Sequence, residues 1–345
     1  MRSGWSGRSG RWGGGRRGNP RRRNRWQQAT AALLICVLVS GSLALFGAAG
    51  GTDRSVAAAA PATSASAFQP TSSVTSAGYP VSAVQLLAPA TTVATSTLIS
   101  GGILRTYLTI APSRRSGPLP LIVVLAGQNA SPTQEALRDE LLPLANRGEA
   151  ILVYPAGYQK SWNVDADSCC GQAGPSNVDD VGFVADVVAA AESSQSVTSG
   201  RVYLAGYSNG GKLAYDVMCR EPQLFAAFAA VSATPLTSCA ASSHTSALVV
   251  VGADDPELPI STDAMPAGAA LAAAAIALRT RDACSATSTS VRDGLATITS
   301  WSSCSGGTAV STVLYTGQEH GWPTTSPSTP GAALLLWRFF NRTLH

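Results

Sequence analysis

The sequence is poor in charge, and its body lacks a basic excess. Only 13% of its 345 residues are charged, and nine of the 24 basic residues lie in the first 26 positions, where no acidic residue occurs. The other 15 basic residues are outnumbered by 20 acidic ones. Because nucleic-acid binding relies on basic surface, this deficit argues against a nucleic-acid partner for the body of the chain.

Charge is entirely absent from residues 29–51, of which 31–49 are strongly apolar. Such a run is long enough to cross a bilayer as a helix of about 20 residues. The arginines before it predict a cytoplasmic N-terminus and an external body. We therefore interpret residues 1–28 as a basic cytoplasmic tail or signal n-region, and 29–51 as a signal-peptide core or membrane anchor. Small-residue sites after the run favour export with cleavage, whereas its length favours an uncleaved anchor, so the protein is expected to be secreted or tethered at the cell surface.

Residues 52–96 are rich in Ala, Ser, Thr and Pro and nearly uncharged, which is typical of a disordered linker. Residues 97–345 form the expected folded domain, beginning with a hairpin over 97–110 that turns at Gly101 and Gly102. Expected strands then cover 118–127, 150–155, 202–205, 228–231, 247–251 and 308–315, and expected helices cover 133–146, 178–192, 212–220, 267–279 and 331–342. This alternation predicts one α/β domain with a mostly parallel central sheet and helices on both faces.

The stretch 206–210 reads Gly-Tyr-Ser-Asn-Gly and lies between an expected strand and an expected helix. This G-x-S-x-G pattern is typical of a nucleophile elbow, in which glycines allow a sharp, strained turn that exposes Ser208. The Asn209 N–H would then point from a helix N-terminus at a developing oxyanion. The second oxyanion donor is expected to be the Gln128 N–H, on the loop after the strand 118–127.

The scarcity of histidine narrows the choice of a general base for this serine. The chain has three histidines, His244, His320 and His345. His345 is the last residue and His244 precedes an expected strand, whereas His320 directly follows the strand 308–315. In folds with this elbow the acid lies between the serine and the histidine, so it is Asp254 or Asp255, after the strand 247–251. Pro256 restricts the backbone of Asp255, which favours that residue as the rigid acid.

The order of these motifs, with Asp255-Pro-x-x-Pro259 and His320-x-Trp-Pro323, resembles the polyhydroxybutyrate-depolymerase-like esterases, which are exported α/β-hydrolases grouped with bacterial feruloyl and acetylxylan esterases. Further matches are Arg105-Thr-Tyr, Val153-Tyr-Pro, Trp162-Asn, Cys169-Cys-Gly171, Val178-Asp-Asp-Val-Gly-Phe183 and Phe225-Ala-Ala. The resemblance implies an α/β-hydrolase fold and ester hydrolysis by Ser208, Asp255 and His320, because the family's acid directly precedes the proline. Two positions depart from the family pattern: Ala126 stands where the oxyanion loop usually has His, and Ile260 replaces the last aromatic of the acid loop.

Six of the seven cysteines lie outside the apolar run, which indicates an oxidising compartment. The resemblance implies the disulfides Cys219–Cys239 and Cys284–Cys304, which leaves Cys169 and Cys170 to pair with each other. Asp165 and Asp167 lie near that pair, but no histidine accompanies them. We therefore expect no metal site and no cofactor.

Three aromatic residues are expected to bind substrate: Trp162, Tyr207 and Trp322. Core packing is the alternative for Trp162. The hypothesis that follows is a monomeric serine esterase acting on hydroxyalkanoate, feruloyl or acetyl-sugar esters. Because the sequence contains no separate polymer-binding domain and no obvious lid insertion, small or soluble esters are favoured. The alternatives are a non-catalytic surface-displayed binding protein with the same fold, or a peptidase or acyltransferase using the same three residues.

Overall fold

The computed structural model describes residues 81–164, 170–236, 239, 244–258 and 266–343. Its strands are β1 (Thr91–Ser100), β2 (Ile103–Pro112), β3 (Leu119–Leu125), β4 (Ile151–Pro155), β5 (Val197–Tyr207), β6 (Ala227–Val231), β7 (Ser246–Gly252), β8 (Thr289–Asp293), β9 (Ala296–Trp301) and β10 (Val310–Tyr315). Its α-helices are α1 (Val81–Leu87), α2 (Pro132–Arg138), α3 (Leu142–Asn146), α4 (Asp180–Ser194), α5 (Asn209–Arg220), α6 (Ala267–Arg281) and α7 (Ala332–Arg342).

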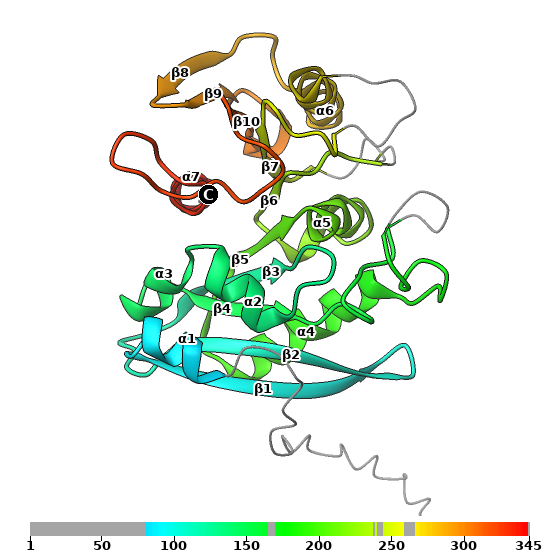
Figure 1. The fold of residues 1–345 in the computed structure, drawn as a ribbon, viewed down its shortest axis with the longest axis vertical. Coiled ribbons are helices and arrows are strands. Elements are labelled where there is room, and N and C mark those ends of the chain that lie inside the picture. The colour runs from blue at the N-terminus through cyan, green and yellow to red at the C-terminus, as the bar shows by residue number, and fades with distance from the viewer. Residues whose placement is uncertain (1–80, 165–169, 237–238, 240–243, 259–265, 344–345) are drawn as a thin grey trace, which may run out of the picture. The chain divides into compact units, whose positions relative to one another are not determined.

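The strands form one sheet in the order β1-β2-β4-β3-β5-β6-β7-β10-β9-β8 (Figure 1). From β4 to β10 every neighbouring pair is parallel. The pairs at the two edges are antiparallel. The carboxyl ends of β3, β5, β7 and β10 therefore lie along one edge of the sheet, where a parallel α/β sheet presents its functional loops.

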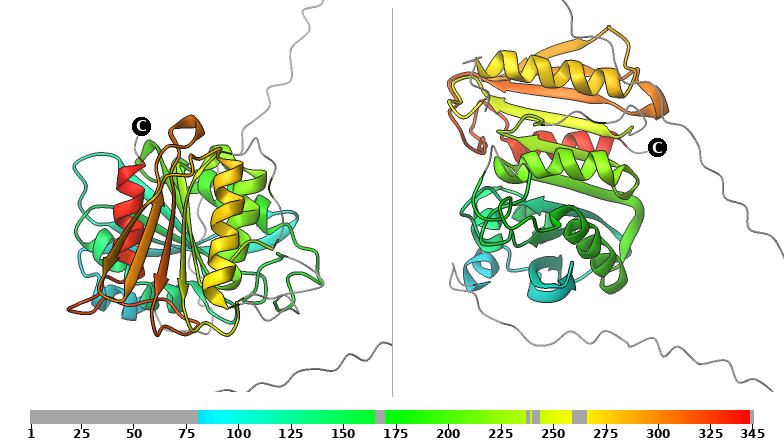
Figure 2. Two further views of the ribbon diagram at one scale, coloured as in Figure 1. Left: turned by 90° about the horizontal axis from the view of Figure 1, so that it is seen from above. Right: turned by 90° about the vertical axis from the view of Figure 1, so that its right-hand side faces the viewer.

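Both faces of the sheet are covered by helices (Figure 2). Side chains of α4, α5 and α6 pack with one set of strand residues, including Leu121 and Val123. Side chains of α1, α2, α3 and α7 pack with the alternate set, including Ile122 and Val124. A strand buried on both faces needs an unbroken apolar sequence, which the sequence of β3 supplies. The predicted fold class, an α/β-hydrolase with a mostly parallel sheet, is confirmed.

The expected helix over 133–146 is wrong, because the segment forms two short helices. A capping box of Ser131 and Gln134 begins α2, which ends at Arg138. Glu140 then has a φ of 57°, and Pro143 stands in the first turn of α3, where its lack of an N–H costs nothing. The break lets the chain turn at Asp139, whose carboxylate accepts hydrogen bonds from the Leu141 N–H and the Tyr154 hydroxyl.

Two strands were missed by the sequence analysis. The hairpin β8–β9 turns at Gly294, which has a φ of 63°. The residues of β8 are almost all exposed, so no apolar pattern marks the strand. The Asp-Gly pair at the turn was the available sequence signal.

The helix α1 and the first half of β1 lie within residues 52–96, which the composition predicted to be a disordered linker. The assignment is wrong for residues 81–96, because the β-branched residues of β1 pair along their whole length with β2. The apolar run 29–51 lies outside the described residues. Within the described part of the chain, no helix is long and apolar enough to span a bilayer.

Candidate active site

The G-x-S-x-G stretch forms the expected sharp turn, between the end of β5 and the start of α5. Ser208 has a φ of 51° and a ψ of −117°, a strained conformation for a residue with a side chain. A Cβ at Gly206 would strike the Gly210 carbonyl, and one at Gly210 would strike the Leu125 carbonyl. The two glycines are therefore required for close approach of backbones, and α5 begins directly after Ser208, three residues earlier than expected.

The structure brings Ser208, His320 and Asp255 together from three separate loops. His320 Nε2 lies 2.9 Å from Ser208 Oγ, and His320 Nδ1 lies 2.9 Å and 3.0 Å from the two Asp255 carboxylate oxygens. Asp255 is only 3% exposed, whereas the neighbouring Asp254 side chain is exposed. A serine, an imidazole and a buried carboxylate in this order can transfer the hydroxyl proton to the imidazole and hold its ring orientation.

The loops that carry the acid and the histidine are fastened to each other by backbone contacts. The Asp254 N–H donates to the Gln318 carbonyl at 3.0 Å, and Gly252 packs against the same carbonyl. On the other side, the Ser232 hydroxyl donates to the Gly321 carbonyl at 2.8 Å. These contacts fix the backbone on both sides of His320, so the imidazole position does not depend on its own hydrogen bonds alone.

The two expected oxyanion donors are the backbone N–H groups of Gln128, on the loop between β3 and α2, and of Asn209, which directly follows Ser208. Within the described residues, neither the Gln128 N–H nor the Asn209 N–H donates a hydrogen bond to another group. Asn209 is the first residue of α5, so its N–H is one of the unpaired donors of a helix N-terminus. The role of these two N–H groups as an oxyanion hole stays a prediction.

Trp162 is buried, with 1% of its surface exposed, which favours the alternative of core packing over contact with substrate. Its Nε1 donates to the Ala126 carbonyl at 2.7 Å, and its backbone N–H donates to Asn209 Oδ1 at 2.8 Å. The Asn209 amide returns a hydrogen bond to the Trp162 carbonyl at 3.3 Å. Trp162 therefore ties the segment before Gln128 to the start of α5, which fixes the spacing between the two candidate oxyanion donors.

Tyr207 and Trp322 lie near His320 in the fold and are mostly buried, with 8% and 5% exposure. The Tyr207 ring centroid lies 5.5 Å from that of His320 and 6.4 Å from that of Trp322. Contact of either aromatic side chain with substrate stays a prediction. In the structure the Tyr207 ring packs between those of His320 and Trp322 and so supports the imidazole.

A buried glutamate paired with an exposed arginine supports the Gln128 loop, a role that the sequence did not predict. The Glu135 carboxylate accepts a hydrogen bond from the Gly127 N–H at 3.2 Å and pairs with Arg138. The Arg138 guanidinium in turn lies 4.2 Å from the centre of the Tyr207 ring. Burial raises the pKa of Glu135, and the Arg138 charge opposes this shift. The sequence of α2 did not indicate that Glu135 and Arg138 support this loop, because charged residues on a short helix are usually exposed to solvent.

Several motifs that carried the family resemblance have structural roles. Arg105 pairs with the buried Asp180 at 2.7 Å, and the Asn163 N–H donates to the other Asp180 oxygen at 2.7 Å. Burial raises the pKa of Asp180, against the lowering effect of Arg105. This pair holds the loop after β4 against α4, and with it Trp162, so these motifs position the site without contacting it.

The two disulfides implied by the resemblance, Cys219–Cys239 and Cys284–Cys304, are both present. Cys170 is also disulfide-bonded.

Cys169, Asp165 and Asp167 lie outside the described residues, as do Pro259, Ile260 and His345. His244 lies 3.6 Å from Asp282, at the end of α6, and takes no part in the Ser208 array. In the part of the chain that the structure describes, no three His, Cys, Asp or Glu side chains gather as metal ligands would.

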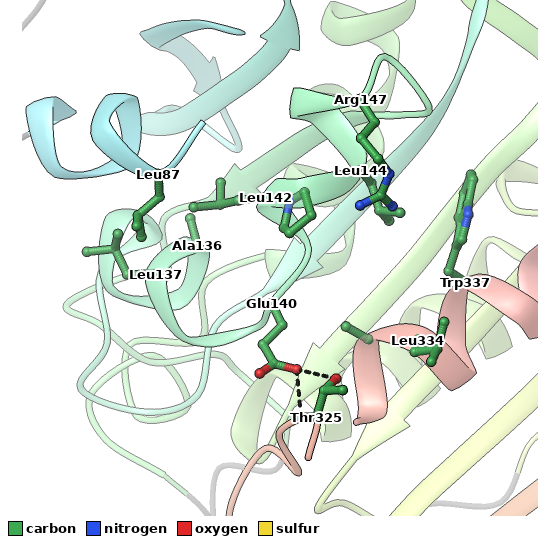
Figure 3. Close-up of a pocket in the computed structure, with 12 residues that line it drawn as sticks. Leu87, Ala136, Leu137, Glu140, Leu142, Leu144, Arg147, Thr325, Leu334 and Trp337 are labelled. Atoms are coloured by element: carbon green, nitrogen blue, oxygen red, sulfur yellow. Dashed lines mark hydrogen bonds between the residues drawn. The ribbon is translucent and has the colours of Figure 1, made fainter. Parts of the chain in front are cut away.

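A surface hollow bounded by α2, α3 and α7 lies next to the loop that follows His320 (Figure 3). At its edge, Glu140 accepts hydrogen bonds from the Thr325 N–H and hydroxyl, each at 2.9 Å. None of the predicted site residues lines this hollow. Its contribution to the site is the Glu140–Thr325 contact, which anchors the far end of the histidine loop.

Residues 104–264 match the family model described as esterase PHB depolymerase. The match confirms the resemblance seen in the sequence, and with it a carboxylic ester hydrolase. The matched segment contains Ser208 and Asp255 and ends before His320. None of the curated proteins compared with the sequence matches it.

Solved structures with a similar fold include an acetyl xylan esterase from Aspergillus awamori, at 13% identity and a TM-score of 0.54, over 72% of this chain and 99% of that chain. Others are a putative dienelactone hydrolase from Klebsiella pneumoniae (15%, TM-score 0.48, 73% and 99%) and the feruloyl esterase module from Clostridium thermocellum (13%, TM-score 0.45, 74% and 90%). At such identities the likeness to the first of these shows the fold alone.

Proposed function

We propose that this chain, a carboxylic ester hydrolase whose residues 104–264 match the esterase PHB depolymerase family, is an exported serine esterase that works through an acyl-enzyme on Ser208. The observation that carries the proposal is the placement of His320. Its Nε2 lies 2.9 Å from Ser208 Oγ, and its Nδ1 lies 2.9 Å from an Asp255 carboxylate oxygen. The proposed substrates are small or soluble esters of the hydroxyalkanoate, feruloyl or acetyl-sugar type.

In the first half of the reaction, Ser208 Oγ attacks the ester carbonyl carbon while its proton moves to His320 Nε2. The carbonyl oxygen becomes an oxyanion between the Gln128 and Asn209 N–H groups. The bond to the alcohol then breaks, and the alcohol oxygen takes the proton from Nε2. Asp255 holds the Nδ1 proton throughout and stabilises the imidazolium. Water repeats the same steps on the acyl-enzyme and releases the acid.

Two features support export of the protein. The Cys219–Cys239 and Cys284–Cys304 disulfides are of the kind that persist in oxidising compartments. The uncharged run 29–51 follows an arginine-rich segment, as in signal peptides and membrane anchors. We propose secretion, or tethering through this run if it is not cleaved.

Steady-state hydrolysis of a panel of substrates tests the proposed activity. We expect turnover of p-nitrophenyl acetate or butyrate, methyl ferulate or hydroxybutyrate oligomers by the purified domain. The matched control is acetyl p-nitroanilide, which carries the same acyl group on an amide nitrogen and is expected to react far more slowly. Cleavage of the anilide with no hydrolysis of any ester would instead support a peptidase.

Gly127→Ala is expected to lower kcat/KM by about 10- to 100-fold, as a misplacement of about 1 Å at a catalytic group does. A Cβ at this position would lie 2.6 Å from the Tyr207 ring, so the loop that carries Gln128 must shift. The measurement is kcat/KM with p-nitrophenyl acetate, together with a melting curve.

Gly117→Ala is the matched control, because nothing lies within 4 Å of a Cβ placed there. It should retain the activity of the unmodified protein. Unchanged kcat/KM in Gly127→Ala would show that the position of the Gln128 loop does not matter for catalysis.

A further inference from the structure

Glu257 places a second carboxylate beside His320, on the side opposite to Asp255. Its Oε2 lies 3.4 Å from His320 Nε2, the nitrogen that also faces Ser208. The Glu257 side chain is 62% exposed, so its charge faces the open side of the site. This residue occupies a variable position of the Asp-Pro-x-x-Pro motif, so the sequence pattern gave no reason to select it.

The position of Glu257 follows from the acid itself. The Glu257 N–H donates to Asp255 Oδ1 at 2.9 Å, so the turn that carries Glu257 is closed by the same carboxylate that holds the imidazole. The backbone at Glu257 is therefore fixed relative to His320. From this backbone the side chain places Oε2 3.4 Å from Nε2.

The chemistry of the reaction identifies what lies beside this carboxylate. His320 Nε2 donates a proton to the oxygen of the departing alcohol, so that oxygen comes within hydrogen-bond reach, about 3 Å, of Nε2. Because Glu257 Oε2 is 3.4 Å from the same nitrogen, it lies at most about 6.5 Å from the alcohol oxygen. The substituents of the alcohol therefore come within reach of Glu257.

Three other charged residues surround the site: Asp255, Arg138 and Lys212. Asp255 adds a second negative charge, although it faces the imidazole. Arg138 lies behind the Tyr207 ring and is paired with Glu135. Lys212 is mostly buried; burial lowers its pKa, and Glu257 and Asp255 raise it, so its charge lies close to both carboxylates. Because the Glu257 side chain is exposed whereas Asp255 and Lys212 are buried, the open side of Nε2 presents a carboxylate to an incoming alcohol group.

We infer that Glu257 is a specificity-determining residue of the proposed esterase, selecting esters of neutral alcohols and disfavouring esters whose alcohol carries a carboxylate close to the scissile oxygen. A polyol can donate hydrogen bonds to Glu257, whereas a carboxylate is repelled by it. The inference rests on the proposed function and narrows its substrate class. Among the proposed substrates it favours sugar esters and disfavours a hydroxyacid dimer, whose departing alcohol ends in a free carboxylate.

Two isosteric acetates test the inference: 3-acetoxybutanamide, with a neutral alcohol, and 3-acetoxybutanoate, with an anionic one. Acetate release gives kcat/KM for each, and the ratio of the two values is the readout. In Glu257→Gln we expect the neutral-to-anionic ratio to fall by about tenfold, since two charges about 5 Å apart at a protein surface interact by that order of magnitude. In Glu257→Lys the ratio should fall further. Salt at 0.5 M should weaken the discrimination of the unmodified protein, because Glu257 is exposed.

Glu319→Gln is the matched control. Glu319 is an exposed carboxylate directly before His320, and its removal changes the net charge equally without removing the contact to Nε2. It should keep the unmodified ratio. The same ratio in the unmodified protein and in Glu257→Gln would overturn the inference while leaving the ester hydrolase intact. A protein that hydrolyses neither acetate nor any other ester would overturn the proposed function, and this inference with it.

Discussion

Ser208→Ala is expected to lower kcat for ester hydrolysis by at least about 10³-fold, because removal of the nucleophile from such an array leaves only binding and oxyanion stabilisation. Ser208 is the residue whose hydroxyl lies 2.9 Å from His320 Nε2. Its backbone, at a φ of 51°, is held by the close approach of Gly206 to Gly210 and not by the hydroxyl. The turn should therefore survive the substitution, with a melting temperature within a few degrees of the original.

The control for this substitution is Ser193→Ala. The Ser193 hydroxyl is on α4 and donates to the Ala190 carbonyl, away from the loops of the site. Its loss should change neither kcat nor the circular-dichroism spectrum. Ester turnover retained in a folded Ser208→Ala protein would remove the serine from the mechanism.

Asp255→Asn is expected to lower kcat by about 10³- to 10⁴-fold, while Asp254→Asn costs less than about tenfold. The two residues are adjacent, but their environments differ. Asp255 is 3% exposed and reaches His320 Nδ1 with both oxygens, so an amide there would favour the wrong imidazole tautomer. Asp254 is exposed and contributes its backbone N–H to Gln318, which asparagine retains.

Steady-state kinetics of the two variants on one ester, with melting curves, distinguishes the roles. Asparagine at 255 can still accept the Glu257 N–H through Oδ1, so the turn should persist and the fold should be unaffected. The fall in kcat would then measure only the loss of the carboxylate that orients the His320 imidazole. The reverse ranking of the two variants would assign the acid to Asp254.

The parts of this protein that were predictable from sequence are those fixed by short-range patterns. The apolar run of β3 and the glycines around Ser208 each specify a local geometry without help from distant residues. Pro143 was a local signal for the break between α2 and α3. It was overlooked because the apolar residues on both sides are also compatible with one continuous helix. The start of the folded domain was missed because the polar residues of β1 resemble a linker until their pairing with β2 is known.

The side chains that support the site were not predictable in the same way. Trp162 lies in a loop, and only the structure shows that its ring is buried and bonded to Ala126. Glu135 and Arg138 meet the Gly127 loop because α2 packs against the end of β3, a tertiary contact without a sequence signature. Sequence motifs predicted the residues with reactive groups. The side chains that hold those residues in place are set by tertiary packing, which the motifs do not specify.

Covalent labelling most directly tests the central claim, that Ser208 is activated by His320 and Asp255. The folded domain is treated with a p-nitrophenyl alkylphosphonate, which forms a stable adduct with an activated serine, and the labelled peptide is located by mass spectrometry. We expect one adduct per chain, on Ser208, that is absent in Ser208→Ala and forms at least about 10²-fold more slowly in Asp255→Asn. Labelling of a different residue, or no labelling of a preparation that hydrolyses esters, would contradict the account.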